Sequence, residues 1–355
     1  MTPPYDLAVN LPLRTDVAAA LGNAVAKTAI AVEDLGYPDP AGALAVRRSI
    51  AGWLRRVGGH GAVDPSRIAL TLGARQALRL ALLQARAPNG VLLVEDHTYQ
   101  GVRALADAMG LRCVDVGMDG QGMRPDALAL AAERNGATVV YVQPTLHNPT
   151  TATMPLSRRM DIAAVAEALG LTLIEGDVYG PLAWHGRDAV PPFAVLAPER
   201  TLHAGGVGKI LGPGLRVGWL LHPDAPTCAL TAVTMQREHD GIPTLWPSVV
   251  SRWMDDGTAD ALLETLALTM AERNATARRI LGPELVTHAS SLHAWLPFAD
   301  PVAVEERLLA HGVRIAASRG FVSADRQPAG IRLALGAEED PARLEKALRL
   351  VAQVL

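Results

Sequence analysis

Cysteine is nearly absent from this 355-residue chain, which has only Cys113 and Cys228. Neither lies in a CxxC pair or a Cys/His cluster, so we expect two free thiols and neither a disulfide nor a metal site. Every apolar run is too short to cross a membrane. The opening MTPPYDLAVNLPLRTD lacks the basic start and apolar stretch of a targeting signal, and we expect a cytoplasmic protein without a membrane segment.

Lysine is scarce, and the net charge is small. Only Lys27, Lys209 and Lys346 among the 33 basic residues are lysines, so chemistry that needs a primary amine has three candidates. The formal net charge of −3 provides no overall attraction to nucleic acid or to acidic membranes. We therefore expect neither nucleic acid nor a membrane as a partner.

What the chain has in quantity is apolar core material, 49% of its residues. Short apolar runs such as RIALTLG, GVLLVED, TVVYVQP, LTLIEGD and RTLHAGG alternate with segments of helical spacing such as ARQALRLALLQA. This pattern is typical of an α/β fold with a mainly parallel central sheet flanked by helices. We expect an N-terminal arm at 1–30, a large domain at 31–230 and a smaller C-terminal α+β domain at 231–355.

Residues with useful chemistry follow the predicted strands. Ligands of parallel sheets bind beyond the carboxyl ends of the strands. Five residues fall just after predicted strands: Gly73, Tyr99, Asn148, Asp177 and Lys209. The sequence therefore predicts a ligand site at this edge of the sheet.

Lys209 lies in the glycine-rich connection HAGGVGKILGPGLRVGW, which also holds Arg216. Glycines let the backbone approach a ligand and present N–H groups to an anion. A lysine of lowered pKa beside an anion site suits a cofactor with a carbonyl and a phosphate, because such an amine forms a Schiff base. The alternative is a surface lysine in a glycine turn. The GxxxxGK[ST] spacing of an ATP-binding loop is absent.

Three polar residues are candidates for contacts to a cofactor ring. A carboxylate at Asp177 would hold a pyridine nitrogen protonated and make the ring a better electron sink. The Tyr179 phenol and the Asn148 amide would bind a ring oxygen. Each has a local alternative, which is capping within the turn for Asp177 and Tyr179 and an ordinary Asx-Pro turn for Asn148.

Further candidates lie at a helix start and in a late strand. Gly73, Ala74 and Arg75 lie in TLGARQAL at a strand-to-helix junction, where unpaired N–H groups and the helix dipole favour phosphate. Tyr99, in VEDHTYQG, either stacks on a planar cofactor or packs in the core. Arg332, in AGIRLALG, either binds a carboxylate through two hydrogen bonds or lies on the strand's outer face.

Taken in order, seven segments resemble those of fold type I enzymes, whose cofactor is pyridoxal 5′-phosphate (PLP). They are DLAVNLP, GYPDPAGALAVRRSIAGWL, TLGARQAL, HNPTTATM, IEGDVYG, GKILGPGLRVGW and IRLALG. The chain resembles class I/II aminotransferases, and most closely the aminotransferase-like domain of MocR-type regulators, over nearly its whole length. The resemblance implies the PLP-dependent transferase fold type I and an aminotransferase that uses PLP.

The resemblance also implies roles for the ring-contacting residues. Lys209 would carry PLP as a Schiff base and shuttle the substrate's proton. Asp177 would pair with the pyridine nitrogen, and Asn148 with Tyr179 would hold the ring hydroxyl.

Other roles implied by the resemblance concern the phosphate, the substrate and a second subunit. Arg216 and the turn at residues 73–75 would bind the phosphate, and Tyr99 would stack on the ring. Arg332 would take the substrate α-carboxylate. Tyr37 would reach the phosphate of the neighbouring subunit, so a homodimer is implied.

The substrate pocket is expected to include three more residues. Asn10 of the N-terminal arm and His147, beside Asn148, are two of them. His293, in SSLHAWL, is either a substrate contact or a packed core histidine. The sequence does not show which amino acid or 2-oxo acid is used.

The sequence departs from the family pattern at three places. Many relatives have Ser-x-Ser-Lys where this chain has GVGK at 206–209, and Thr151 replaces a common glycine. Many relatives place the ring aspartate three residues before the tyrosine, where this chain has Gly176. We assign the role to Asp177, two residues before the tyrosine as in some MocR-type domains, because a carboxylate is chemically required and Glu175 should face the opposite side.

Three functions are consistent with these residues. The first is transamination between an amino acid and a 2-oxo acid. The second is another PLP reaction of a biosynthetic pathway, such as that of a lyase, decarboxylase, oxidase or cyclising enzyme. The third is a MocR-type module that binds PLP and an amine without turnover. Those regulators carry an N-terminal winged helix, and this chain begins where that domain's partner would start, so we expect no DNA binding of that kind.

Overall fold

The computed structural model describes residues 5–27, 32–186 and 188–355. Its centre is a seven-stranded sheet with the order β2-β10-β9-β8-β7-β3-β4. The pairs β9·β8, β8·β7, β7·β3 and β3·β4 are parallel, whereas β10 runs antiparallel to both β2 and β9. The strands are β2 (Ile68–Thr71), β3 (Val91–Glu95), β4 (Arg112–Val116), β7 (Val139–Val142), β8 (Thr172–Gly176), β9 (Thr201–Gly206) and β10 (Gly218–Leu221).

Both faces of this sheet are buried, which explains why its strands read as continuous apolar runs. In β7, Val139 and Tyr141 pack in the cluster that includes α3, whereas Val140 and Val142 pack in the cluster under α5 and α6. The helices around the sheet are α2 (Leu44–Val57), α3 (Ala74–Ala85), α4 (Gln100–Ala108), α5 (Pro125–Asn135), α6 (Leu156–Ala168), α7 (Gly180–Ala183), α8 (Phe193–Leu196), α9 (Ala225–His239) and α10 (Leu245–Asp256).

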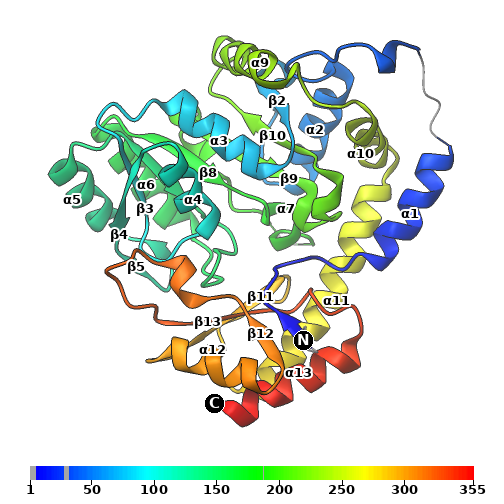
Figure 1. Ribbon diagram of the computed structural model, residues 1–355. Coiled ribbons are helices and arrows are strands. Elements are labelled where there is room, and N and C mark those ends of the chain that lie inside the picture. Colours follow the sequence, from blue (N-terminus) through cyan, green and yellow to red (C-terminus); the bar gives the residue numbers. More distant parts are fainter. Residues whose placement is uncertain (1–4, 28–31, 187) are drawn as a thin grey trace.

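The C-terminal elements form a second, smaller α+β unit below the large sheet in Figure 1. Strand β1, near the N-terminus, pairs in parallel with β12, so the arm expected from the sequence is tied into this unit. Strands β11 and β13 pair antiparallel, and α13 packs on α11 and α12. These elements are β1 (Tyr5–Leu7), α11 (Thr258–Leu281), β11 (His293–Pro297), α12 (Pro301–Ala310), β12 (Val313–Ile315), β13 (Gly330–Ala334) and α13 (Pro341–Val354).

Several short elements complete the described chain. Helix α1 follows the N-terminal strand, and β5 pairs with β6 as a two-stranded ribbon. The remaining bounds are α1 (Thr15–Ala26), β5 (Met118–Asp119), β6 (Gly122–Met123) and the 3₁₀ turns Val32–Leu35, Pro65–Arg67, Pro198–Arg200, Val207–Lys209, Pro213–Leu215 and Ser318–Phe321.

The predicted fold class is confirmed, with a mainly parallel sheet, flanking helices and a smaller C-terminal α+β unit. Helix α9 packs on β2 and α10 packs on α2, so these helices belong with the large sheet. We therefore propose that the smaller unit begins within α11 rather than at residue 231. Cys113 and Cys228 are free thiols. The described helices include none long and apolar enough to cross a membrane, and the described side chains form no cluster suited to a metal ion.

Candidate active site

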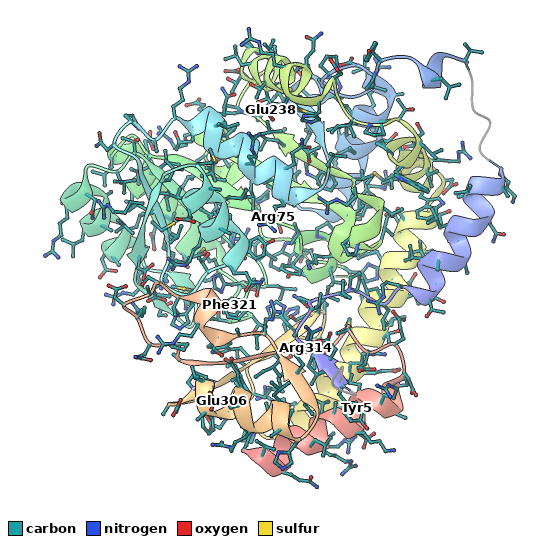
Figure 2. The ribbon with its side chains drawn as sticks, viewed as in Figure 1. Tyr5, Arg75, Glu238, Glu306, Arg314 and Phe321 are labelled. Atoms are coloured by element: carbon teal, nitrogen blue, oxygen red, sulfur yellow. The ribbon has the colours of Figure 1, made fainter. Side chains whose placement is uncertain are left out.

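One cavity of about 420 Å³ brings together most of the residues singled out in the sequence. It lies where the parallel strands end, and because β10 is antiparallel, the residues before β10 reach the same edge. In Figure 2, Arg75 lies near the middle of the molecule and Phe321 lies below it, at the upper side of the C-terminal unit. Ten predicted residues line the cavity: Asn10, Gly73, Ala74, Arg75, Tyr99, Asn148, Tyr179, Lys209, Arg216 and Arg332.

The charges of this cavity are all positive. Lys209, Arg75, Arg216 and Arg332 line it, and no Asp or Glu is among its described lining residues. None of these four cations forms a salt bridge with a described residue. A cavity with several uncompensated cations is suited to a ligand that carries two or more negative groups.

Lys209 ends the short 3₁₀ turn that follows β9, so the sheet holds its amine at the cavity. Its Nζ atom donates a hydrogen bond to the backbone oxygen of Asn10 at 2.5 Å. Burial, and next the nearby Arg332 guanidinium, lower the pKa of Lys209 to about 8. A substantial fraction of the amine is therefore neutral near physiological pH, and the neutral amine is the form that attacks a carbonyl.

This pKa predicts how cofactor loading depends on pH. The rate of PLP capture by cofactor-free protein should rise with pH and level off above about 8, instead of rising towards the usual lysine value of 10.5. Stopped-flow absorbance measures the rate. The substitution Arg332→Gln should move the midpoint to higher pH, because it removes a cation that disfavours protonated Lys209. A wild-type midpoint above about 10 would contradict the burial of this amine.

Asn10 connects the N-terminal segment to the edge of the sheet at which the cavity lies. Its amide nitrogen donates to the Tyr179 hydroxyl at 2.8 Å and lies 3.0 Å from Nδ1 of His293. The Nε2 atom of His293 lies 3.1 Å from the backbone oxygen of His147 and must donate to it, so Nδ1 accepts from Asn10. Burial, followed by the charge of Arg332, lowers the pKa of His293 to about 3, which keeps this ring neutral.

Arg332 reaches the cavity from β13 of the smaller unit. Its guanidinium donates to Oδ1 of Asn148 at 2.9 Å and to the backbone oxygen of Ala8, and it lies over the Phe321 ring at 5.1 Å. Its Nε atom is buried and has no hydrogen-bond partner among the described residues. Arg332 is 5% exposed and has no carboxylate partner among the described residues. Burying an unpaired charge costs free energy, and a bound anion would offset that cost.

The turn before α3 forms an anion cradle with Arg216. The backbone N–H groups that open a helix have no partner within it, and Gly73, Ala74 and Arg75 all line the cavity at this point. Gly73 has φ +83° and ψ 169°, a conformation that is essentially restricted to glycine. Arg216, itself at φ +53°, places its guanidinium 3.5 Å from the position of a Cβ atom on Gly73 and donates to the backbone oxygen of Leu72.

The substitution Gly73→Ala should weaken PLP binding about tenfold or more, because it displaces N–H groups expected to face the phosphate, and should cost about 1–3 kcal/mol of stability. Gly257→Ala is the matched control, since Gly257 also has a positive φ, +85°, but has open space around it and lies outside the cavity. Equilibrium dialysis and thermal unfolding measure the two effects. Equal PLP affinity in both variants would contradict the cradle.

Four predicted residues are not among the lining residues: Tyr37, His147 and His293, and Asp177, which is described below. Tyr37 is 90% exposed and is not among the lining residues, so its proposed contact to a neighbouring subunit remains a prediction. His147 is buried behind the cavity, with its Nε2 atom 3.4 Å from Oε2 of Glu95. His293 is also absent from the lining residues and contacts Asn10, which does line the cavity. Of the two alternatives for His293, a packed core histidine is the one that agrees with this position.

Asp177 does not take the position predicted for it. Its Oδ1 atom accepts the N–H of Gly180 at 2.7 Å, and its Oδ2 atom lies 3.6 Å from Nε2 of His203. Burial disfavours the charged forms of Asp177 and His203, but the attraction between the two groups is stronger. The pKa of Asp177 is therefore lowered and that of His203 is raised. The residue at the cavity is Gly176. The predicted carboxylate therefore lies on the face of the sheet opposite the cavity.

Tyr141 and Gln143 line the cavity and were not predicted from the sequence. The amide nitrogen of Gln143 lies within hydrogen-bond distance of Glu95, Thr98 and the backbone oxygen of Asn148. Both residues lie on or just after β7 and two residues apart, so strand alternation places them on one face of the sheet. That alternation, combined with Asn148 downstream, was the signal available in the sequence.

Comparison with known proteins identifies the family. The family model described as "Aminotransferase class I and II" matches residues 4–351. The chain belongs to the class I and II aminotransferases. PLP is the cofactor of this family, which confirms the cofactor predicted from the sequence.

Similar proteins include both regulators and enzymes. The chain is 28% identical over 280 residues to YdfD of Bacillus subtilis, an uncharacterized HTH-type transcriptional regulator, covering 78% of the chain and 56% of that protein. The chain spans between 51% and 62% of three such regulators. An archaeal alanine:glyoxylate aminotransferase matches with a TM-score of 0.87 and 22% identity, over 98% of this chain and 90% of its own. The α-aminoadipate aminotransferase LysN of Thermus thermophilus matches with a TM-score of 0.84 and 22% identity, over 98% and 91%. These structures establish the fold.

The described residues fit PLP in most respects. A buried amine at Lys209, a glycine-and-arginine cradle and a cavity of about 420 Å³ match an aldehyde, a phosphate and a small aromatic ring. One part of the family pattern is not met in the cavity, since its described lining residues include no carboxylate to pair with the ring nitrogen.

Proposed function

We propose that this protein is a PLP-dependent aminotransferase that moves an amino group between an α-amino acid and a 2-oxo acid. The observation that carries the proposal is that one cavity holds two buried cationic groups. They are the Lys209 amine and the Arg332 guanidinium, which has no carboxylate partner among the described residues. One suits the attachment of PLP, and the other suits the carboxylate that amino acids and 2-oxo acids share.

The proposed roles follow from the contacts of each residue. When bound, PLP supplies a carbonyl carbon and an electron-withdrawing ring. Arg332 binds the substrate carboxylate and, through its hydrogen bond to Asn148, is held at a fixed angle. Neutral Lys209 takes the proton from the substrate Cα and returns it at the cofactor carbon.

Asn10 and Tyr179 position these groups. The backbone oxygen of Asn10 holds the Lys209 amine, and its side chain donates to the Tyr179 hydroxyl. Burial raises the pKa of Tyr179 to about 12, so its phenol stays neutral and can donate to the ring hydroxyl oxygen that we assign to Tyr179 and Asn148. The Gly73–Arg75 turn and Arg216 would hold the phosphate, and Tyr99 would stack on the ring.

We further propose a homodimer in which Tyr37 reaches the phosphate of the neighbouring subunit. Three exposed apolar side chains of the segment before α2 support this, since Val32, Leu35 and Tyr37 are 83%, 81% and 90% exposed. Large apolar side chains that gather at one exposed place are typical of contact surfaces.

A second candidate is a module that binds PLP and an amine without turnover. The lack of a carboxylate among the described lining residues favours it, because a pyridine ring whose nitrogen has no acidic partner is a weaker electron sink. The likeness to HTH-type regulators is consistent with it.

A single half-reaction separates the two candidates. PLP-loaded protein mixed with each common amino acid, in the absence of a 2-oxo acid, should form one equivalent of oxo acid and leave the cofactor as its amine. Adding a 2-oxo acid should then restore the starting absorbance. Binding of amino acids with a spectral change but without oxo acid would contradict transamination and support the binding module.

A further inference from the structure

The cavity floor between β7 and β8 is built differently from a site with a ring carboxylate. Tyr141 pairs in register with Ile174, and Gly176 is the next residue of β8 on the same face. A Cβ atom on Gly176 would lie 2.5 Å from the Tyr141 hydroxyl oxygen and 2.8 Å from its ring. The phenol of Tyr141 therefore occupies the space that a side chain at position 176 would fill.

The Tyr141 hydroxyl is available to a ligand. The residue is only 2% exposed, yet it lines the cavity, and within the described chain its hydroxyl donates no hydrogen bond to a protein acceptor. Burial, and next the nearby Glu95 carboxylate, raise the pKa of Tyr141 well above its usual value. The group is thus a neutral phenol with a proton to donate.

The arrangement of the other site residues directs the ring nitrogen to this phenol. In PLP the aldehyde carbon is flanked by the ring hydroxyl and the phosphate arm, and the nitrogen lies across the ring from it. Lys209 follows β9, the proposed phosphate cradle lies at β2 and β10, and Tyr179 and Asn148 lie at β8 and β7. With these three groups held, the nitrogen would point away from Lys209 and towards the floor formed by Tyr141 and Gly176.

Two other groups near this floor, the Asp177 carboxylate and the Gln143 amide nitrogen, already have protein partners. Asp177 accepts from Gly180 and pairs with His203 on the opposite face of the sheet. The Gln143 amide nitrogen lies within hydrogen-bond distance of three protein oxygens.

We propose that the Tyr141 hydroxyl donates a hydrogen bond to the pyridine nitrogen of PLP in this chain, in place of a carboxylate, and that this nitrogen stays unprotonated. A neutral phenol of this kind cannot hold a pyridinium as an aspartate does, because it offers no negative charge. The ring consequently withdraws less electron density from the substrate. A larger share of the rate enhancement then comes from the proton transfers at Lys209. The proposal rests on PLP binding, which is part of the proposed function, but not on transamination.

The test is the ¹⁵N NMR signal of PLP labelled at its ring nitrogen and bound to the full-length protein. We expect the chemical shift of an unprotonated, hydrogen-bonded pyridine in the wild type. Tyr141→Phe should move this shift towards that of a pyridine without a hydrogen bond and should weaken PLP binding about 3- to 10-fold. Asp177→Asn should leave the shift unchanged.

A rescue variant keeps the test independent of a single substitution. The exchange Tyr141→Ala with Gly176→Asp opens the space and brings in a carboxylate, and it should move the signal to the pyridinium range. A pyridinium signal in the wild type that disappears in Asp177→Asn would overturn the proposal and return the role to Asp177. An unprotonated signal unaffected by Tyr141→Phe would overturn it as well.

The outcomes separate this proposal from the proposed function. If the protein does not bind PLP, both are overturned. If it binds PLP with an unprotonated, Tyr141-dependent nitrogen but yields no oxo acid, only transamination is overturned.

Discussion

Replacing Lys209 with alanine is expected to remove covalent PLP attachment and to lower turnover by about 10³-fold or more. A positioned acid–base group alone contributes about 10²–10⁴-fold, and Lys209 is also proposed to carry the cofactor. No other lysine can substitute, since Lys27 and Lys346 are exposed residues outside the cavity. Visible absorbance after removal of free PLP, together with the rate of oxo acid formation, measures both losses.

Two variants control for this result. Lys209→Arg retains a positive charge and a similar volume but has no primary amine, so it should lose covalent attachment to the same extent. Lys346→Ala changes an exposed lysine of α13 and should behave like the wild type. Full turnover in Lys209→Ala, or a retained absorbance band in Lys209→Arg, would rule out the assigned role.

Replacing Arg332 with glutamine should lower the second-order rate constant for amino acids by about 10²- to 10³-fold. Truncating one partner of a buried, hydrogen-bonded charge pair costs about 2–5 kcal/mol. Among the described residues Arg332 contacts the Asn148 amide and no carboxylate, so the pair that is lost would be the one with the substrate. The loss should depend on the substrate carboxylate. Primary amines without a carboxylate should therefore react with the cofactor at nearly the wild-type rate.

Arg349→Gln is the matched control for charge. Arg349 pairs with Glu345 on the exposed side of α13 at 2.6 Å, and exposed pairs of this kind contribute about 0–1 kcal/mol. Its kinetics should match those of the wild type. An equal loss for amino acids and simple amines in Arg332→Gln would show that Arg332 supports the fold instead of binding the carboxylate.

Local sequence signals predicted the architecture of this chain because they agree with its tertiary structure. Apolar runs such as VLLVE and TLIEG form strands covered on both faces, and the helical spacing after each run forms the helices that cover them. The packing of α9 on β2 and of α10 on α2 was not predicted, since helical spacing shows that a helix has an apolar face but not which neighbour covers it.

Three of the four cavity cations were predictable because each follows a strand of the large sheet or precedes an antiparallel one. Lys209 after β9, Arg216 before β10 and Arg75 after β2 reach one edge once the strand order is known. The contacts of Asn10 could be seen only in the tertiary structure. Its link to Lys209, Tyr179 and His293 joins segments that lie far apart in the chain.

The position of Asp177 shows where sequence reasoning failed. Glu175 was correctly expected to face away from the cavity, and its carboxylate accepts the N–H groups of Phe193 and Ala194. Side chains of a strand alternate, so the face of Glu175 is also the face of position 177, and only Gly176 faces the cavity. A chemical requirement for an acid does not override this alternation, and the side chain that faces position 176 is that of Tyr141 on β7.

The central claim, that Lys209 is the cofactor lysine, can be tested by borohydride reduction of the PLP-loaded protein followed by peptide mapping. Reduction fixes PLP on the amine that bears it, and with only three lysines in the chain the assignment is unambiguous. Trypsin should release one PLP-modified peptide spanning residues 201–216, at about one equivalent per chain. Modification of Lys27 or Lys346, or an unmodified 201–216 region that trypsin cleaves at Lys209, would contradict the account.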